Sequence, residues 1–317
     1  MKALQFDTKG DLSSLALRDV PDAVTADGQV LVQVRAAGIN PSDVKNVLGI
    51  FPYTTVPRIA GRDFAGVVVA GPVEWLGKEV FGCASENGFH QDGSHAELLA
   101  VTPSALVEKP EQLSFVQAAA LGVPYVTAWE AIKRARLVAG ERILILGAGA
   151  VAKAAAQLLR WQGHEAVMAL RNAEQLAQLQ ASGQACVALT APEQLPDQVQ
   201  AHFGALADFI FDTTGQLLAP AVYSLARFGR LAVIAAPKGG MAELPLLPLY
   251  RRGGVLIGVN SLLHDNQACN DLLRELLPGF VSGALVPDTP ATCPLTDGVA
   301  AYHAIHQGGV TKLVLLP

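Results

Sequence analysis

The residues that most directly suggest chemistry are three small ones, spaced Gly147-x-Gly149-x-x-Ala152. They follow an apolar run at 143–146 and precede a helix-forming run. In this pattern the first glycine permits a tight turn, the second lets the backbone approach a pyrophosphate, and the third small residue lets helix and strand pack closely. The motif predicts a dinucleotide site on the start of the helix, with an ordinary strand-to-helix turn as the alternative. The expected contacts are Gly147, Gly149, Ala150 and Val151.

The residue after the second expected strand bears on which cofactor fits. That strand, at 166–170, is followed by Arg171, whereas NAD-binding folds usually place an acidic residue there for the ribose 2′-hydroxyl. An arginine can pair with a 2′-phosphate and leaves no carboxylate to repel it. The sequence therefore predicts NADPH rather than NADH, with a solvated arginine at a strand end as the alternative.

The composition is that of a compact globular protein and gives no electrostatic case for binding nucleic acid. The 317 residues are 51% hydrophobic and 16% charged, and the formal net charge is −5 without a basic run. Four widely spaced cysteines, none in a Cys-x-x-Cys motif, predict free thiols in a reducing compartment. The apolar stretch at 143–152 is too short to span a bilayer, so we expect a cytoplasmic protein without membrane partners.

The pattern of apolar runs separates a β-rich N-terminal part from an alternating α/β part. Strand-like runs at 30–35, 66–70 and 96–101 are separated by clusters of glycine and proline. From residue 142 onward, short apolar runs alternate with helical runs, which favours a doubly wound parallel sheet. The expected strands are 143–146, 166–170, 185–189, 209–211, 230–234 and 255–259, and the expected helices between them include 151–162, 173–181 and 217–227.

Further helices are expected before and after this alternating part. The capping-box pattern Ser114-x-x-Gln117 predicts a helix start, and a helical run covers 125–134. Near the end of the chain we expect helices at 270–277 and 298–306 and a strand at 311–316.

Several motifs in order along nearly the whole chain resemble the medium-chain dehydrogenase/reductase superfamily, and within it the zinc-free quinone oxidoreductase (zeta-crystallin-like) branch. The motifs lie at 34–43, 57–67, 93–97, 118–129, in the glycine fingerprint and in the tail 309–317. The resemblance implies a fold with a GroES-like catalytic domain, residues 1–121 and 260–317, and a Rossmann domain, residues 122–259. It also implies a cleft between the domains, a small-molecule substrate and a homodimer.

Two positions separate this chain from the zinc-dependent members of that superfamily. Those members have a cysteine ligand where this chain has Asn40, and a histidine ligand where it has Arg62. Asparagine is a poor zinc ligand, and a guanidinium does not bind a metal. We therefore assign no metal ligands. The pair His303-x-x-His306 has metal-ligand spacing, but histidines at the end of a helix also suit its dipole.

An oxidoreductase without zinc needs other groups to stabilise the negative charge that develops on the substrate oxygen. The candidate catalytic residues are Asn40, Lys45 and Tyr53. Asn40 is equally well explained as the residue that holds a turn before Pro41, and Tyr53 as a wall of the pocket. Members of the branch often carry tyrosine at the position of Lys45.

The resemblance also implies cofactor contacts outside the glycine motif. Thr127 would contact the nicotinamide end, or it caps a helix. Lys312 would reach the cofactor phosphates, or it is a surface charge. Backbone groups would line the nicotinamide side at Ala235, Ala236, Val259 and Asn260.

These features together predict an NADPH-dependent, zinc-free oxidoreductase that transfers hydride to quinones or related conjugated carbonyl compounds such as enones. One alternative is an enoyl-thioester reductase, although that branch has Gly-x-Tyr-Pro where this chain has Phe51 before its proline. A second is a zinc-free enzyme that resembles alcohol dehydrogenases. An alternative of another class is a non-catalytic NADPH-binding protein with a structural or regulatory role.

Overall fold

Two compact units make up residues 1–308 and 312–317, the part of the chain that this computed structural model describes. Unit 1 consists of Met1–Val126 and Ser261–Pro317, and unit 2 of Thr127–Asn260. Unit 1 is therefore discontinuous in sequence. Helix α3 (Gly122–Ala135) carries the chain out of unit 1 and into unit 2.

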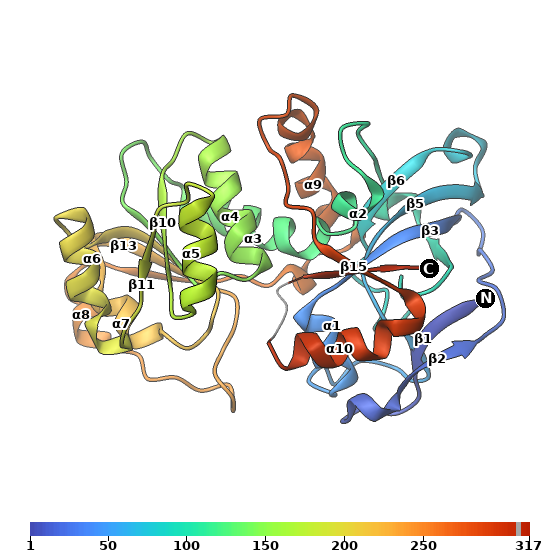
Figure 1. The fold of residues 1–317 in the computed structure, drawn as a ribbon, viewed down its shortest axis with the longest axis horizontal. Helices are drawn as coiled ribbons and strands as arrows, with labels where there is room; N and C mark the ends of the chain where they lie inside the picture. Colours follow the sequence, from blue (N-terminus) through green and yellow to red (C-terminus); the bar gives the residue numbers. More distant parts are fainter. Residues whose placement is uncertain (309–311) are drawn as a thin grey trace. The chain divides into compact units, whose positions relative to one another are not determined.

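Unit 2 is built on a parallel sheet whose described strands follow the order β11-β10-β9-β12-β13-β14; β10, β11 and β13 are labelled in Figure 1. This is the doubly wound order that the alternating pattern predicts. Both β9 and β10 are buried along their whole length, as expected for strands covered on both faces. The strands are β9 (Ile143–Leu146), β10 (Ala166–Leu170), β11 (Cys186–Ala188), β12 (Ala207–Asp212), β13 (Leu225–Val233) and β14 (Val255–Gly258).

The helices of unit 2 agree with the sequence prediction in part. The predicted helix at 173–181 is α5, whereas the prediction for 217–227 is wrong in its second half. Helix α7 ends at Tyr223, where the Ser224 hydroxyl donates to the carbonyl of Pro220 (2.8 Å), and Leu225 already pairs with β12. The helices are α4 (Ala150–Trp161), α5 (Ala173–Ala181), α6 (Leu195–Phe203), α7 (Leu218–Tyr223) and α8 (Leu246–Arg251), of which α6 and α8 were not predicted.

Unit 1 is β-rich, as the sequence predicts. Its described strands form a small sheet, β2-β1-β4, and a larger one, β15-β16-β3-β5-β6-β8, in which β7 also pairs with β3. The strands are β1 (Lys2–Phe6), β2 (Leu15–Asp19), β3 (Val30–Ile39), β4 (Arg58–Ile59), β5 (Asp63–Ala70), β6 (Glu79–Cys83), β7 (Leu98–Val101), β8 (Val107–Glu108), β15 (Ala291–Pro294) and β16 (Leu313–Leu316).

Strand β3 organises unit 1 because it pairs with β5, β7 and β16. Its register places Gly38 opposite Asp63 of β5 and Ile39 opposite Leu313 of β16. The end of β3 therefore brings the start of β5 and the start of the C-terminal strand to the same place. The predicted strand at 311–316 is observed from Leu313, and Thr311 lies outside the described residues.

Besides the start of α3, the described part of unit 1 contains the helices α1 (Pro41–Val47), α2 (Phe115–Ala118), α9 (Asn266–Val281) and α10 (Gly298–His306). The capping box at Ser114 is confirmed, since the Gln117 backbone N–H donates to its hydroxyl (3.2 Å). Helix α10, red in Figure 1, lies beside α1 and β2 in blue. Among the helices of residues 1–308 and 312–317, none combines the length and apolar character that crossing a bilayer requires.

Candidate active site

A buried polar cluster in unit 1 consists of Asn40, Asp63 and Lys312, and we call it the Asp63 cluster. The Lys312 ammonium donates to the Asn40 amide oxygen (2.7 Å) and to Asp63 Oδ2 (3.2 Å). The Asn40 amide nitrogen donates to the same carboxylate oxygen (2.8 Å). All three residues are buried, with Asp63 wholly inaccessible to solvent. The three side chains therefore satisfy one another away from water.

Three strand ends place these side chains together. Asn40 follows β3 and caps the start of α1, Asp63 is the first residue of β5, and Lys312 directly precedes β16. Because β3 pairs with both β5 and β16, its register determines which residues meet. The interpretation of Asn40 as a turn residue before a proline agrees with its position at the start of α1.

The start of α3 supplies the remaining donor to Asp63. The backbone N–H of Val123 donates to Asp63 Oδ1 (3.0 Å), so this oxygen lies at the positive end of a 14-residue helix. Gly122 makes the approach possible, since a Cβ at that position would lie 2.1 Å from Asp63 Oδ1. Any larger residue at 122 would displace the carboxylate.

A second buried ion pair, Asp43 with Arg62, borders the Asp63 cluster. Arg62 Nε lies 4.0 Å from Asp43 Oδ1, and Arg62 Nη2 donates to the Ser42 hydroxyl (3.1 Å). The other Asp43 oxygen accepts the backbone N–H of Asn40 (2.7 Å). Burial raises the pKa of Asp43 to about 6, although the positive charge of Arg62 opposes that shift.

His95 is a further buried titratable group in unit 1. Its Nε2 lies 3.3 Å from the Gly38 carbonyl oxygen and its Nδ1 lies 2.9 Å from the Tyr302 hydroxyl. Because a carbonyl only accepts, Nε2 carries the proton and Nδ1 accepts from Tyr302. Burial lowers the pKa of His95 to about 4, so the ring is neutral near pH 7.

The residues around Asn40 and Arg62, where zinc-dependent members of the superfamily have zinc ligands, do not fit a zinc ion. Lys312 and Arg62 are two buried positive charges in this part of unit 1. The Asn40 amide oxygen already accepts a hydrogen bond from the Lys312 ammonium. Within residues 1–308 and 312–317, no three His, Cys, Asp or Glu side chains are grouped as metal ligands would be. A dication here would be repelled and would lack soft donors.

The other two predicted catalytic residues, Lys45 and Tyr53, lie outside the buried cluster. Lys45 is exposed on α1, and Tyr53 is 44% exposed in the loop that follows. Tyr53 packs against Phe51, Phe89 and His90, with ring centroids 5.6–5.9 Å apart. This loop is attached to α1 because Thr54 donates to the Asn46 side chain (2.5 Å). Both groups remain available to a small molecule.

In unit 2 the glycine motif forms the turn that the sequence predicts. Gly147 follows β9 with a φ of +109°, a conformation that favours glycine, and a Cβ there would lie 2.6 Å from Thr213 Oγ1. Gly149 caps α4, and Ala150 and Val151 begin it. In the described structure no side chain caps this helix, so its first N–H groups can bind a phosphate.

The remaining predicted cofactor residues of unit 2 follow the carboxyl ends of its strands, apart from Thr127, which is buried on α3. Arg171 is exposed directly after β10. Because parallel strands end at one edge of a sheet, the residues after β13 and β14 share that edge with the glycine turn. These residues are Ala235, Ala236, Val259 and Asn260.

Sequence reasoning missed Asp212, the last residue of β12. Its buried carboxylate accepts the backbone N–H of Thr214 (2.8 Å) and of Gly215 (3.2 Å). The turn that it organises places Thr213, whose hydroxyl donates to the Leu146 carbonyl (2.7 Å), beside the glycine turn. An aspartate followed by Thr-Thr-Gly at a strand end is the signal that could have found it.

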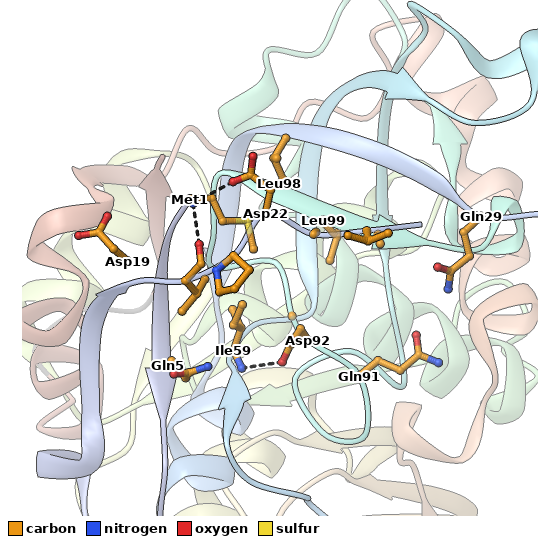
Figure 2. Close-up of a pocket in the computed structure, with 16 residues that line it drawn as sticks. Met1, Gln5, Asp19, Asp22, Gln29, Ile59, Gln91, Asp92, Leu98 and Leu99 are labelled. Atoms are coloured by element: carbon orange, nitrogen blue, oxygen red, sulfur yellow. Dashed lines mark hydrogen bonds and ion pairs between the residues drawn. The ribbon is translucent and has the colours of Figure 1, made fainter. Parts of the chain in front are cut away.

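A separate pocket of about 640 Å³ lies on unit 1 near the N-terminus (Figure 2). Of its lining residues, Asp22 pairs with the Met1 ammonium (2.9 Å) and Asp92 with Arg58 (2.9 Å). Asp92 also accepts the Ile59 backbone N–H (3.1 Å), as Figure 2 shows. The residues that line this pocket include none of the predicted site residues, so we do not place the active site there.

Comparison with known proteins agrees with this description of the two units. Residues 26–111 match the family described as "Alcohol dehydrogenase GroES-like domain", and residues 150–276 match "Zinc-binding dehydrogenase". A zinc-type alcohol dehydrogenase-like protein of Schizosaccharomyces pombe is 35% identical over 99% of this chain and 97% of its own length. The 2-methylene-furan-3-one reductase of Solanum lycopersicum is 36% identical over 100% of this chain and 79% of its own length.

A solved structure extends the comparison to the fold. The quinone oxidoreductase of Thermus thermophilus, determined alone and in complex with NADPH, superposes with a TM-score of 0.84 at 30% identity, covering 100% of both chains. The chain belongs to the medium-chain dehydrogenase/reductase superfamily, in its quinone oxidoreductase branch. It is an oxidoreductase, and the alternative of a non-catalytic NADPH-binding protein is set aside.

Two of the buried titratable groups, Asp43 and His95, are expected to have opposite effects on stability. Between about pH 4 and 6 the folded chain holds a proton on Asp43 that the unfolded chain has lost, so this group destabilises the fold as pH rises. His95 binds its proton less tightly when folded, so it stabilises the fold as pH rises. Each effect is about 3 kcal/mol, so in the wild type they nearly cancel.

The variant Asp43→Asn removes one of these opposing effects. Its free energy of unfolding relative to wild type is expected to rise by about 3 kcal/mol between pH 4 and 6. Denaturant unfolding of both proteins at several pH values measures the difference. Asp19→Asn, at an exposed carboxylate, serves as the matched control and should stay within about 0.5 kcal/mol of wild type. A pH-independent difference for Asp43→Asn would show that the carboxyl is not buried as described.

Proposed function

We propose that this chain is an NADPH-dependent, zinc-free reductase that transfers hydride to quinones or related conjugated carbonyl acceptors. The Asp63 cluster is the observation that carries the proposal, because an ion-paired set of side chains stands where zinc-dependent members bind metal. Relatives named for a quinone and for a methylene-furanone, which is a conjugated ketone, support the acceptor class. Enoyl thioesters and simple aldehydes are the alternative substrates.

The proposed roles of the chain's own residues follow from their exposure. The nicotinamide supplies the hydride, and the protein has to stabilise charge on the acceptor oxygen. Lys45 and Tyr53 are exposed donors that could reach a small molecule, and we assign them this role. Asn40 keeps one amide hydrogen after its bond to Asp63, so it can add a donor at the buried end of the site.

The first test follows NADPH consumption by purified, chelator-treated protein with quinones, enones, enoyl thioesters and aldehydes. Turnover of quinones and enones is expected to survive the chelator, because no step depends on a metal. Lys45→Met and Tyr53→Phe should each lower kcat/KM about tenfold or more, since each removes a donor to developing charge.

Matched controls for these variants are Lys78→Met, at a half-buried position, and Tyr223→Phe, at an exposed one, both elsewhere on the chain. Both are expected to leave kcat/KM unchanged. Loss of turnover on chelation would contradict the zinc-free proposal. Faster reduction of crotonyl-type thioesters than of quinones would reverse the proposed order of substrates.

We propose that the cofactor is NADPH and that Arg171 selects it. The support is the exposed guanidinium directly after β10, where the next helix begins with Asn172 as its cap. Gly147 and the uncapped start of α4 would hold the pyrophosphate. Backbone groups of residues 235–236 and 259–260 and the side chain of Thr127 would line the nicotinamide. Lys312 is assigned to the Asp63 cluster rather than to the phosphates, because its ammonium already makes two bonds there.

The variant Arg171→Ala is expected to weaken NADPH binding by roughly tenfold to a hundredfold, the range for a hydrogen bond between charged groups. Binding of NADH should not change, because it carries no 2′-phosphate. Fluorescence titration with each cofactor measures both constants. Arg160→Ala, an exposed arginine of α4, is the matched control. Equal losses for both cofactors, or none for NADPH, would contradict the assignment.

We propose a homodimer formed through the edge of the unit 2 sheet. Strand β14 ends the described sheet and exposes Val255 and Leu256, while Leu246 and Tyr250 of α8 and Phe228 of β13 are also exposed. An unpaired edge with exposed apolar side chains is a surface that a second copy can cover symmetrically. Light scattering is expected to give twice the 33.2 kDa chain mass.

The variant Leu256→Lys should convert the dimer to a monomer, because it places a charge on the covered edge. Val73→Lys, at an exposed apolar residue of unit 1, is the control and should leave the mass unchanged. A wild-type mass of one chain at micromolar concentration would rule out the dimer.

A further inference from the structure

Asp212 ends strand β12, which lies between β9 and β13 in the sheet of unit 2. Its register pairs it with Leu146 of β9 on one side and with Val233 of β13 on the other. The glycine turn directly follows β9, and residues 235–236, the backbone proposed to line the nicotinamide, follow β13. Because parallel strands end at one edge of a sheet, Asp212 lies between the two parts of the proposed cofactor site.

The Asp212 carboxylate is wholly buried and is satisfied by the turn that follows it. Oδ1 accepts the backbone N–H of Thr214 (2.8 Å), the Thr214 hydroxyl (2.7 Å) and the backbone N–H of Gly215 (3.2 Å). Oδ2 accepts the backbone N–H of Leu217 (3.4 Å). Hydrogen bonds to an ionised acceptor are stronger than those between neutral groups, so this one side chain fixes the backbone of residues 213–217.

On one side, this turn holds the carbonyl that leads into the glycine turn. Thr213 donates to the Leu146 carbonyl twice, from its backbone N–H (3.1 Å) and from its hydroxyl (2.7 Å). Leu146 precedes Gly147, whose own N–H donates to the Ala169 carbonyl (2.9 Å). A Cβ on Gly147 would lie 2.6 Å from Thr213 Oγ1, so the two turns are in direct contact. The position of Thr213 therefore determines where the glycine turn lies.

On the other side, the turn packs against the peptide that joins Ala235 and Ala236. A Cβ on Gly215 would lie 2.6 Å from the Ala235 carbonyl carbon and 2.8 Å from the Ala236 nitrogen. Gly215 also has a φ of +68°, in the left-handed region that favours glycine. Because no space separates the two segments, moving the turn moves the backbone of residues 235–236.

We propose that Asp212 is a positioning residue for the cofactor, which places the glycine turn through Thr213 and the nicotinamide side through Gly215. The carboxylate acts through the turn, since it is wholly buried and both of its oxygens accept hydrogen bonds from the turn. This inference rests on the proposed dinucleotide site. It adds that one buried charge holds both halves of that site.

The first variant is Asp212→Asn, which keeps the size of the side chain but removes its charge and turns one acceptor into a donor. Binding of NADPH is expected to weaken roughly tenfold, the lower end of the range for a hydrogen bond to a charged group. Binding of NADH should weaken by the same factor, because both cofactors contain the pyrophosphate and the nicotinamide. Fluorescence titration of the purified protein measures both constants. Asp197→Asn, at an exposed carboxylate of α6, is the matched control.

Two further variants separate the two sides of the turn, with 2′-phospho-ADP-ribose as a probe that has the pyrophosphate but no nicotinamide. Thr213→Val removes one bond to the Leu146 carbonyl at nearly constant volume. It should weaken NADPH and the probe by the same factor, about threefold to tenfold. Gly215→Ala pushes on the backbone beside the nicotinamide, so it should weaken NADPH and leave binding of the probe unchanged.

Matched controls exist for both variants in unit 2. Thr190→Val is at an exposed threonine. Gly204→Ala is at a glycine with a similar φ of +71°, where a Cβ would meet nothing within 4 Å. Both controls should leave every dissociation constant unchanged. Thermal unfolding of each variant shows that it is folded, and the nearly isosteric Thr213→Val keeps the test valid if Asp212→Asn does not fold.

Wild-type dissociation constants in folded Asp212→Asn or Thr213→Val would overturn the inference and leave Asp212 with a role in stability alone. A loss in Asp212→Asn that is confined to NADPH, or equal losses of NADPH and the probe in Gly215→Ala, would also contradict it. Failure of the wild-type protein to bind either cofactor would overturn the proposed dinucleotide site itself, and this inference with it.

Discussion

Unit 1 depends on the burial of one carboxylate, that of Asp63. A carboxylate removed from water is stable only when charged and hydrogen-bonding partners replace its hydration. Here the partners come from three separate segments: the Asn40 amide after β3, the Val123 N–H at the start of α3, and the Lys312 ammonium before β16. Satisfying this one group therefore links the first third of the chain to its last strand.

The same interaction determines what chemistry unit 1 can support. A metal site uses several electron-pair donors around one cation, whereas the oxygens of Asn40 and Asp63 already accept hydrogen bonds within the Asp63 cluster. The groups proposed to polarise an acceptor are the exposed Lys45 and Tyr53, which lie outside the cluster on α1 and in the loop after it, and the remaining amide hydrogen of Asn40. The family name that mentions zinc therefore applies to the fold that the members share, whereas the side chains around Asn40 in this chain do not form a zinc site.

The sequence predicted those parts of the fold that local patterns encode. Strands β9 and β10 and helices α5 and α10 match the expected bounds because each is a short run of one periodicity. The boundary after Tyr223 was missed because residues 217–227 continue in helix-like composition, and only pairing with β12 turns Leu225 into a strand. Tertiary pairing of this kind has no local signal.

In the candidate site, too, the sequence predicted the residues that local patterns mark but not the contacts between distant segments. Gly147 was found because a left-handed turn before a helix requires glycine. Asn40 and Lys312 were identified separately, but their direct bond was not, since 272 positions separate them in the sequence. Asp212 was missed because its carboxylate only shapes the turn that follows it, by accepting the backbone N–H groups of Thr214 and Gly215.

The position of Lys312 has a consequence for how the chain is synthesised. Asp63 leaves the ribosome long before Lys312 does, so for most of translation the carboxylate lacks the ammonium with which it pairs in the fold. Unit 2 is continuous in sequence and is complete before that partner exists. The first part of unit 1 thus has to wait as an incompletely folded segment, tethered to a finished neighbour, until the final strand arrives and the carboxylate can leave water.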